Sequence, residues 1–261
     1  MDPNDLKFKP AQTAFKLRQR LAQMSAASQM LARNTQNDKS RKYLGLMNQS
    51  ICQMLRIVGR MELMELLGPN QTAKREALNL GRLIAETGAQ LEGLLAQTGV
   101  RLTVEGPEYL FACADEGLLR QMLLELIVNA AKVGTEVELK LARAGDRAVF
   151  TVTDNGAGIP EETLAKLFAE DSGQTPVWEK KGDGIALVRR IAALHDGTLM
   201  AECRPEGGLR VSVMISLGQE QTGTMHSPKL SWDSGGFREE LVALSDLLPL
   251  EIFCNVWEEQ G

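Results

Sequence analysis

The chain has 261 residues, enough for one large domain or two small ones, and its 44% hydrophobic and 24% charged residues are ordinary for a globular protein. Its net charge of −5 gives no general attraction to nucleic acid or anionic lipid. Apolar stretches fall short of the roughly 18 to 20 residues of a membrane helix. No basic leader followed by an apolar run opens the sequence, so we expect a cytoplasmic protein without a signal peptide.

The first 70 residues predict two amphipathic helices. Apolar residues recur at steps of three and four over residues 12–33 and again over residues 40–67. The polar segment 34–38 separates the two patterns, and Gly68-Pro69-Asn70 ends the second. A lone hairpin cannot bury so broad an apolar stripe. We therefore expect residues 1–70 to form a homodimer, as a four-helix bundle; the alternative is packing onto the following domain.

Residues 71–218 mix helical and strand-like patterns. In chain order we expect a helix (72–97), two strands (100–104 and 110–113), a helix (116–132), two strands (137–142 and 148–153), a short helix (160–168), a polar loop (169–181), a helix (184–195) and two strands (198–203 and 210–217). This mixture implies helices covering one face of a sheet, an α/β fold. Residues 219–261 form an acidic extension, with eight acidic and two basic residues and a short helix near 237–248.

Four cysteines, at positions 52, 113, 203 and 254, are far apart in the sequence and include no Cys-x-x-Cys pair. The chain has only two histidines. This composition argues against a zinc site and predicts reduced, mostly buried thiols in a reducing compartment.

The helix expected over 116–132 carries the first chemical motif. Glu125 and Asn129 are four residues apart and so share one face. The amide oxygen of Asn129 suits Mg²⁺, and a carboxylate one turn earlier can hold an attacking water or hydroxyl. Lys132 is near enough in sequence to reach a phosphate. The alternative is an ordinary polar face of a buried helix.

Two glycine motifs follow. Asp154-Asn-Gly-Ala-Gly158 ends a strand, where a carboxylate can accept from the adenine amine and the glycines let the backbone approach the base; the alternative is a simple turn. Gly182-Asp-Gly184 precedes a helix, whose free N–H groups can face phosphates. Lys180 and Lys181, just before it, are either phosphate contacts or solvated lysines.

In this order the three motifs closely resemble the N, G1 and G2 boxes of the ATP-binding fold shared by sensor histidine kinases, Hsp90, MutL and type II topoisomerases. Further similar stretches are Ala114 to Glu125, Lys166 to Phe168, Leu194 to Leu199 and Gly207 to Val213. The resemblance implies a two-layer α/β sandwich with a mixed sheet over about residues 75–218, preceded by the helical hairpin.

The resemblance also implies a site for ATP and Mg²⁺. Its nucleotide-binding residues would be Asn129, Lys132, Asp154, Gly156, Gly158, Ile159, Phe168, Lys181, Gly182, Gly184 and Ile185. Glu125, Asn129 and Lys132 would be catalytic, with Asn129 binding the metal. The Glu-Leu-x-x-Asn form of the first box occurs in Hsp90, MutL and one kinase subgroup, where the Glu is implicated as a general base, so ATP hydrolysis stays open.

The hairpin resembles the dimerisation and phosphoacceptor region of sensor kinases only loosely. Leu21-Ala-Gln-Met-Ser25 looks like the run before the acceptor histidine, but Ala26 and Ala27 follow. The only histidines are His195, in the region resembling the catalytic domain, and His226, in the tail. A phosphoacceptor would then be a His, Ser or Thr of a partner protein, or Ser25 or Ser28.

Three functions remain open: an ATP-dependent kinase, an ATP-binding scaffold that regulates a partner without phosphorylating it, and a slow ATPase. The resemblance implies a response regulator as partner, docking on the hairpin. The acidic tail would dock over the nucleotide lid or bind another protein, or it is only a loosely packed extension.

Overall fold

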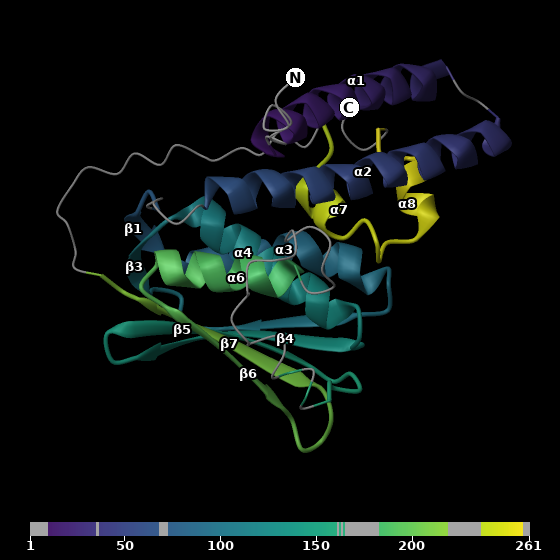
Figure 1. The fold of residues 1–261 in the computed structure, drawn as a ribbon. Helices are drawn as coiled ribbons and strands as arrows, with labels where there is room; N and C mark the ends of the chain where they lie inside the picture. The colour runs from purple at the N-terminus through teal and green to yellow at the C-terminus, as the bar shows by residue number, and fades with distance from the viewer. Residues whose placement is uncertain are drawn as a thin grey trace. The chain divides into compact units, whose positions relative to one another are not determined.

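The computed structural model describes residues 10–34, 37–67, 73–160, 162, 164, 183–218 and 236–257. The chain divides into two compact units, Met1–Gln71 with Trp232–Gly261, and Thr72–Ser231 (Figure 1). Most of the helix expected over 160–168 and all of the loop 169–181 lie outside the described residues. None of the described helices is both long and apolar enough to cross a membrane.

The first unit contains the expected hairpin. Helices α1 (Pro10–Asn34) and α2 (Asp38–Leu66) run antiparallel and pack against each other (Figure 1). Asn37 caps α2, because its side chain accepts from the backbone N–H of Lys39. Between the helices, the hydroxyl of Ser28 donates to Oδ1 of Asn48 at 2.5 Å, in a fully buried position.

The described part of the C-terminal segment packs on α2. It forms two short helices, α7 (Glu239–Ala243) and α8 (Leu250–Cys254), where the sequence suggested one. Nδ2 of Asn48 donates to the carbonyl of Phe253 at 2.9 Å. Arg56 donates to the carbonyl of Ala243 and pairs with Asp246. Asn48 therefore joins α1 and α8 to α2 through one buried amide.

The second unit is built on a mixed five-stranded sheet of order β2-β4-β5-β7-β6. Its strands are β2 (Arg101–Glu105), β4 (Glu136–Ala144), β5 (Arg147–Asp154), β6 (Thr198–Cys203) and β7 (Leu209–Ser216). Among the described strands of this sheet, β2 and β4 pair in parallel and the other neighbours pair antiparallel. Helices α3 (Leu80–Ala96), α4 (Glu116–Ala131) and α6 (Asp183–Leu194) cover one face (Figure 1). The predicted two-layer α/β sandwich is confirmed.

One element differs from the sequence-based expectation. Residues 72–97 were predicted as a single helix, but β1 (Glu76–Asn79) pairs antiparallel with β3 (Phe111–Ala114), and α3 begins only at Leu80. The side chain of Asn79 caps α3 by accepting from the backbone N–H of Gly81 at 3.1 Å. The helix pattern is local, whereas the strand forms because a partner more than 30 residues away supplies its hydrogen bonds.

His195, at the end of α6, is a buried structural residue. It is 1% exposed; Nδ1 donates to the carbonyl of Ile191 at 2.8 Å, and Nε2 accepts from the backbone N–H of Asp115 at 3.0 Å. This pairing requires the neutral ring with its proton on Nδ1. Burial lowers the pKa of His195 below its ordinary value, against smaller opposing effects from its hydrogen bond and nearby acids.

Candidate functional site

Asp154 is the centre of the candidate site. Strand β5 ends with this residue, and its side chain is only 4% exposed. Oδ1 accepts from the backbone N–H groups of Gly156 at 2.8 Å and Leu209 at 3.3 Å. Both bonds fall on one oxygen, and among the described residues Oδ2 has no hydrogen-bond partner. The carboxylate is thus held rigidly, with one oxygen left to accept from a ligand.

Glycines allow the backbone to close tightly around Asp154. A Cβ on Gly208 would lie 2.0 Å from the carbonyl oxygen of Asp154, and one on Gly156 would lie 2.7 Å from the carbonyl oxygen of Val133. Gly158 has a φ of +73°, in the left-handed region that favours glycine. Ile159, next along, accepts at its carbonyl from Sγ of Cys203 at 3.2 Å. No side chain fits in the first two places without moving the backbone.

The C-terminal end of α4 lies next to the glycines that surround Asp154. Gly156 packs against Val133, which directly follows the C-cap residue of that helix, so the first two sequence motifs are brought together. Asn129 is half-buried, and within the described residues its amide makes no hydrogen bond. Lys132 is the exposed C-cap residue of α4. The helix end therefore presents an amide and an ammonium group one turn apart.

Glu125 lies one turn before Asn129. Its side chain is 3% exposed, and Oε1 accepts from Nε2 of Gln121 at 3.2 Å. A buried carboxylate is costly unless it is hydrogen-bonded. Glu125 is therefore held in a fixed position on the helix that carries Asn129.

The third motif is only partly described. Gly184 is buried and Ile185 half-buried in the first turn of α6, which packs against α4. Phe168, Lys181 and Gly182 lie outside the described residues. The structure thus brings the first two motifs together and places the start of α6 in the same helical layer.

Two contributors to the site were not identified as such from the sequence. Nη1 of Arg204 donates to the carbonyl of Asp154 at 3.1 Å, and the backbone N–H of Leu209 binds the Asp154 carboxylate. Both come from the β6–β7 hairpin, about 50 residues downstream. The only local signal is the Gly207-Gly208 pair, whose φ values of +97° and +91° require glycine.

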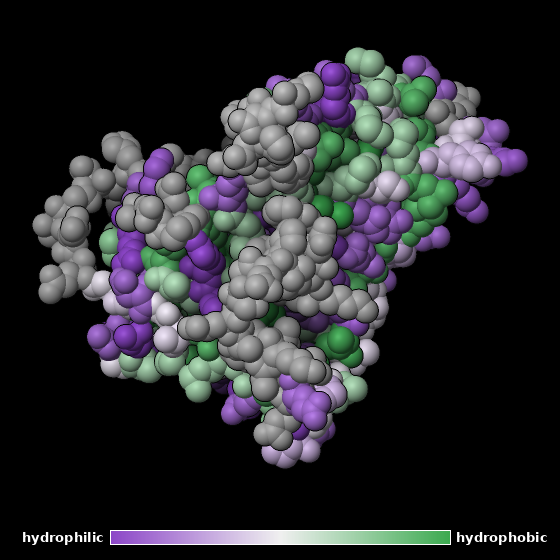
Figure 2. All heavy atoms as spheres, in the orientation of Figure 1, coloured by the Kyte–Doolittle hydropathy of each residue, from purple (hydrophilic) through white to green (hydrophobic). Residues whose placement is uncertain are grey.

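The hairpin exposes a regular apolar stripe. On α2 the exposed or half-buried apolar residues of the stripe are Tyr43, Met47, Met54, Ile57, Met61 and Met64, and polar Ser50 occupies one position of the same spacing of four and three residues. Tyr43 is 62% and Ile57 52% exposed. On α1, exposed Leu17, Met24 and Leu31 follow at steps of seven. Figure 2 shows hydrophobic surface in the part of the view that holds α1 and α2. Such spacing is typical of a coiled-coil seam.

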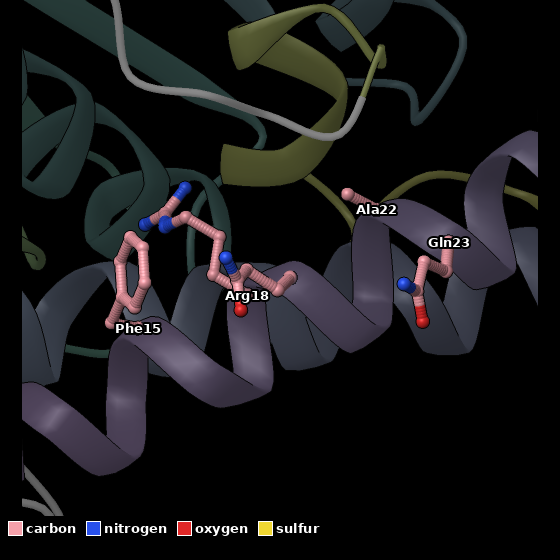
Figure 3. Close-up of a pocket in the computed structure, with 5 residues that line it drawn as sticks. Phe15, Arg18, Ala22 and Gln23 are labelled. Atoms are coloured by element: carbon pink, nitrogen blue, oxygen red, sulfur yellow. The ribbon is translucent and has the colours of Figure 1, made fainter.

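A shallow hollow of about 310 Å³ lies on α1 (Figure 3). It is lined by Phe15, Arg18, Gln19, Ala22 and Gln23. Phe15 is 58% exposed, while Nε of Arg18 donates to Glu62 of α2 at 2.8 Å. The hollow is lined by one helix only, and its charged residue already has a partner.

Two serines of the hairpin that were considered as acceptors are buried. Ser25 is 1% and Ser28 0% exposed. The Ser28 hydroxyl donates to Asn48, and Ser25 is also hydrogen-bonded or otherwise engaged. Neither hydroxyl is open to a nucleotide in this conformation.

Comparison with known proteins agrees with the geometry. Residues 114–219 match the family described as histidine kinase-, DNA gyrase B-, and HSP90-like ATPase. The circadian input-output histidine kinase CikA of Synechococcus elongatus (strain ATCC 33912) is 38% identical over 110 residues, which are 39% of this chain and 14% of CikA. The adaptive-response sensory kinase SasA of Prochlorococcus marinus (strain MIT 9313) is 34% identical over 155 residues, 55% of this chain and 42% of SasA.

The fold is shared with a larger solved protein. The crystal structure of full-length ShkA in complex with AMPPNP matches 81% of this chain and 46% of ShkA, with a TM-score of 0.66 and 21% identity. The chain spans only part of the length of the curated relatives that it matches: 14% of CikA and 51% of the sensor-like histidine kinase SenX3 of Mycolicibacterium smegmatis. The match to the ATPase family, the mixed sheet under three helices and the clustered first and second motifs lead to one assignment: residues 114–219 are a histidine kinase-, DNA gyrase B- and HSP90-like ATPase domain.

Proposed function

We propose that the unit Thr72–Ser231 binds Mg·ATP and that the chain acts as a histidine-kinase-like signalling protein, transferring a phosphoryl group to a partner protein. The observation that carries the nucleotide proposal is Asp154. Its Oδ1 is fixed by two backbone amides and its Oδ2 remains available as an acceptor. An exocyclic adenine amine is the donor that such an oxygen fits.

The surrounding backbone also fits a flat base. Gly156, Gly158 and Gly208 place main chain where side chains would otherwise project, and Gly156 and Gly208 have no room for a Cβ. We expect Ile159 and Ile185 to provide apolar contacts with the nucleotide. Gly182, Gly184, Lys181 and Phe168 would complete the site around the phosphates, as the family resemblance implies.

Asn129 fits a magnesium ion. Its half-buried amide has no protein hydrogen bond within the described ranges, and amide oxygen is a suitable hard ligand. When bound, Mg·ATP supplies the γ-phosphoryl group with its charge partly neutralised by the metal. Lys132 then stabilises phosphate charge from the end of α4, and Glu125 orients the attacking hydroxyl, imidazole or water.

The acceptor is proposed to belong to another molecule. The hairpin contains no histidine, and Ser25 and Ser28 are buried. We infer that two copies associate through the apolar stripe of α1 and α2 as a four-helix bundle, and that a response regulator or other signalling protein docks on the hairpin.

One observation favours a second candidate function. The hairpin lacks an acceptor histidine while Asp154 and Asn129 keep a geometry suited to a nucleotide. A scaffold that binds ATP and regulates a partner without phosphorylating it has the same features. A slow ATPase is the third possibility, since Glu125 is present.

A single labelling experiment separates the three. The purified full chain is incubated with Mg²⁺ and γ-labelled ATP, alone and with a candidate partner, while label on protein and free phosphate are followed together. Transfer to the partner, absent with Asn129→Ala and retained with Asp146→Asn in the exposed β4–β5 turn, supports the kinase. Free phosphate alone supports an ATPase. Tight ATP binding without either product supports the scaffold, and no ATP binding at all contradicts the whole proposal.

A further inference from the structure

A cavity of about 290 Å³ is lined mainly by side chains of β2, β4 and β5 that alternate with buried core residues of the sheet. Helices α3, α4 and α6 cover the other face of this sheet (Figure 1). The walls of the cavity come from β2, β4, β5 and the β6–β7 hairpin. The lining residues that matter are Arg101, Thr103, Glu136, Glu138, Thr153 and Arg210. This outer cavity is also lined by Asp154, Asn155 and Arg204, so it borders the candidate nucleotide site.

Strand register brings these side chains into rows. Glu138 pairs with Thr103 on one side and with Thr153 on the other, and Thr153 pairs with Arg210. Arg101 pairs with Glu136 one row further along the sheet. Side chains directly opposite on neighbouring strands are close enough to interact, so the two rows form one polar cluster.

Thr153 is the unusual member of the cluster. It is 6% exposed, and its Oγ1 is buried with no hydrogen bond among the described residues. By contrast Thr151, two residues earlier on the same face, shares a hydrogen bond of 3.3 Å with Ser212. Because buried hydroxyl groups are nearly always paired, Thr153 marks a position where an incoming acceptor gains a bond.

Two of the cavity's guanidinium groups already have partners. Nη1 of Arg210 donates to Glu202 at 2.8 Å. Arg204 binds Glu206 and the carbonyl of Asp154. These two cations are therefore largely neutralised by acids outside the cavity.

Besides Asp154, three charged groups of the cavity remain. The side chains of Arg101, Glu136 and Glu138 make no hydrogen bond or ion pair within the described part of the chain. Lys140 is close enough to act on Glu138 electrostatically, but it gives its hydrogen bond to Glu105 at 2.8 Å. With Asp154, three acids face the one base that has no partner, which disfavours a simple anion. A complementary ligand has one negative group and a net positive charge.

We propose that the outer cavity binds a small zwitterion of net positive charge, of the class of free arginine and lysine. Its carboxylate accepts from the Thr153 hydroxyl and the Arg101 guanidinium, forming a charge-assisted pair. Its cationic groups lie against Glu136 and Glu138. None of these contacts is made by Asp154 or by the helical layer, but Asp154 lines the same cavity, so the test is made without nucleotide.

The test is calorimetric titration of the full chain, without nucleotide, with L-arginine. Matched probes are agmatine, which lacks the carboxylate, and inorganic phosphate, which lacks the cations. We expect arginine to bind with a Kd of about 1 mM or lower, at least about tenfold more tightly than either probe. Glu138→Gln and Thr153→Val should each weaken arginine binding several-fold, whereas Thr198→Val, on the same sheet face outside the cavity, should not.

Thr153→Val is nearly isosteric and removes a hydroxyl without a partner, so its melting temperature should equal or exceed that of the parent chain. Folding failure therefore does not obscure the result. Phosphate binding as tight as arginine would make this an anion site and overturn the proposal. So would arginine binding that survives both cavity variants, or no arginine binding at about 10 mM.

Discussion

Asp154→Asn tests the nucleotide site most directly. The substituted amide keeps an oxygen that can accept from the N–H groups of Gly156 and Leu209, now at 2.8 and 3.3 Å from Oδ1. The place of Oδ2 is then taken by an NH₂ group, which donates rather than accepts. The NH₂ group of the variant then faces the adenine amine, and because both groups are donors they form no hydrogen bond.

The loss of ATP affinity can be calculated from the hydrogen bond between Oδ2 of Asp154 and the adenine amine, which the variant cannot form. A hydrogen bond to a charged group contributes about 1.5–3 kcal/mol, which corresponds to a roughly 10- to 150-fold loss of ATP affinity. Folding stability should change by about 1 kcal/mol or less, because both backbone amides keep an acceptor. Asp154→Ala should instead destabilise the fold by about 1–3 kcal/mol, since the backbone N–H groups of Gly156 and Leu209 lose their acceptor.

The assay compares ATP with ITP by calorimetry. ITP carries a carbonyl where ATP carries the amine, so the parent chain should prefer ATP, and Asp154→Asn should lose or reverse that preference. Asp146→Asn, an exposed residue of the β4–β5 turn, is the matched control and should behave like the parent. Unchanged ATP affinity and unchanged preference in a folded Asp154→Asn protein would refute the assignment of Asp154.

Three further predictions concern the rest of the molecule. Because folding lowers the pKa of His195, its contribution to stability is present above pH 6.5 and is lost as the pH falls below 6.5 towards the lower pKa of the folded state. Between pH 7.5 and 5.5 the parent chain should therefore lose more stability to urea unfolding than His195→Gln does. Ile57 is 52% exposed, and Ile57→Glu, which places a charge in the apolar stripe, should turn a dimer into a monomer by light scattering, whereas Lys39→Glu at the exposed start of α2 should not. Burial raises the pKa of the Cys52 thiol to about 12, so a thiol reagent at pH 8 should modify exposed Cys203 first and Cys52 only on unfolding.

The sequence determined the parts of this protein that depend on local pattern. Apolar spacing located α1 and α2 to within a few residues, because each helix must turn one stripe inward. Alternation located the central strands β4 and β5. Asp154-Asn-Gly-Ala-Gly158 could be identified because a strand end that doubles back needs glycine wherever φ is positive, as it is at Gly158.

The tertiary structure decided what distant segments contribute. Strand β1 forms only because β3 pairs with it, and the local helical pattern before Leu80 is overridden. The Asp154 carboxylate is oriented by Leu209, and its carbonyl by Arg204, each from a hairpin about 50 residues away. The C-terminal segment is joined to α2 through Asn48, a link with no signature in either segment. Backbone amides and buried polar groups must find partners wherever the fold brings them close, and that proximity does not depend on sequence neighbours.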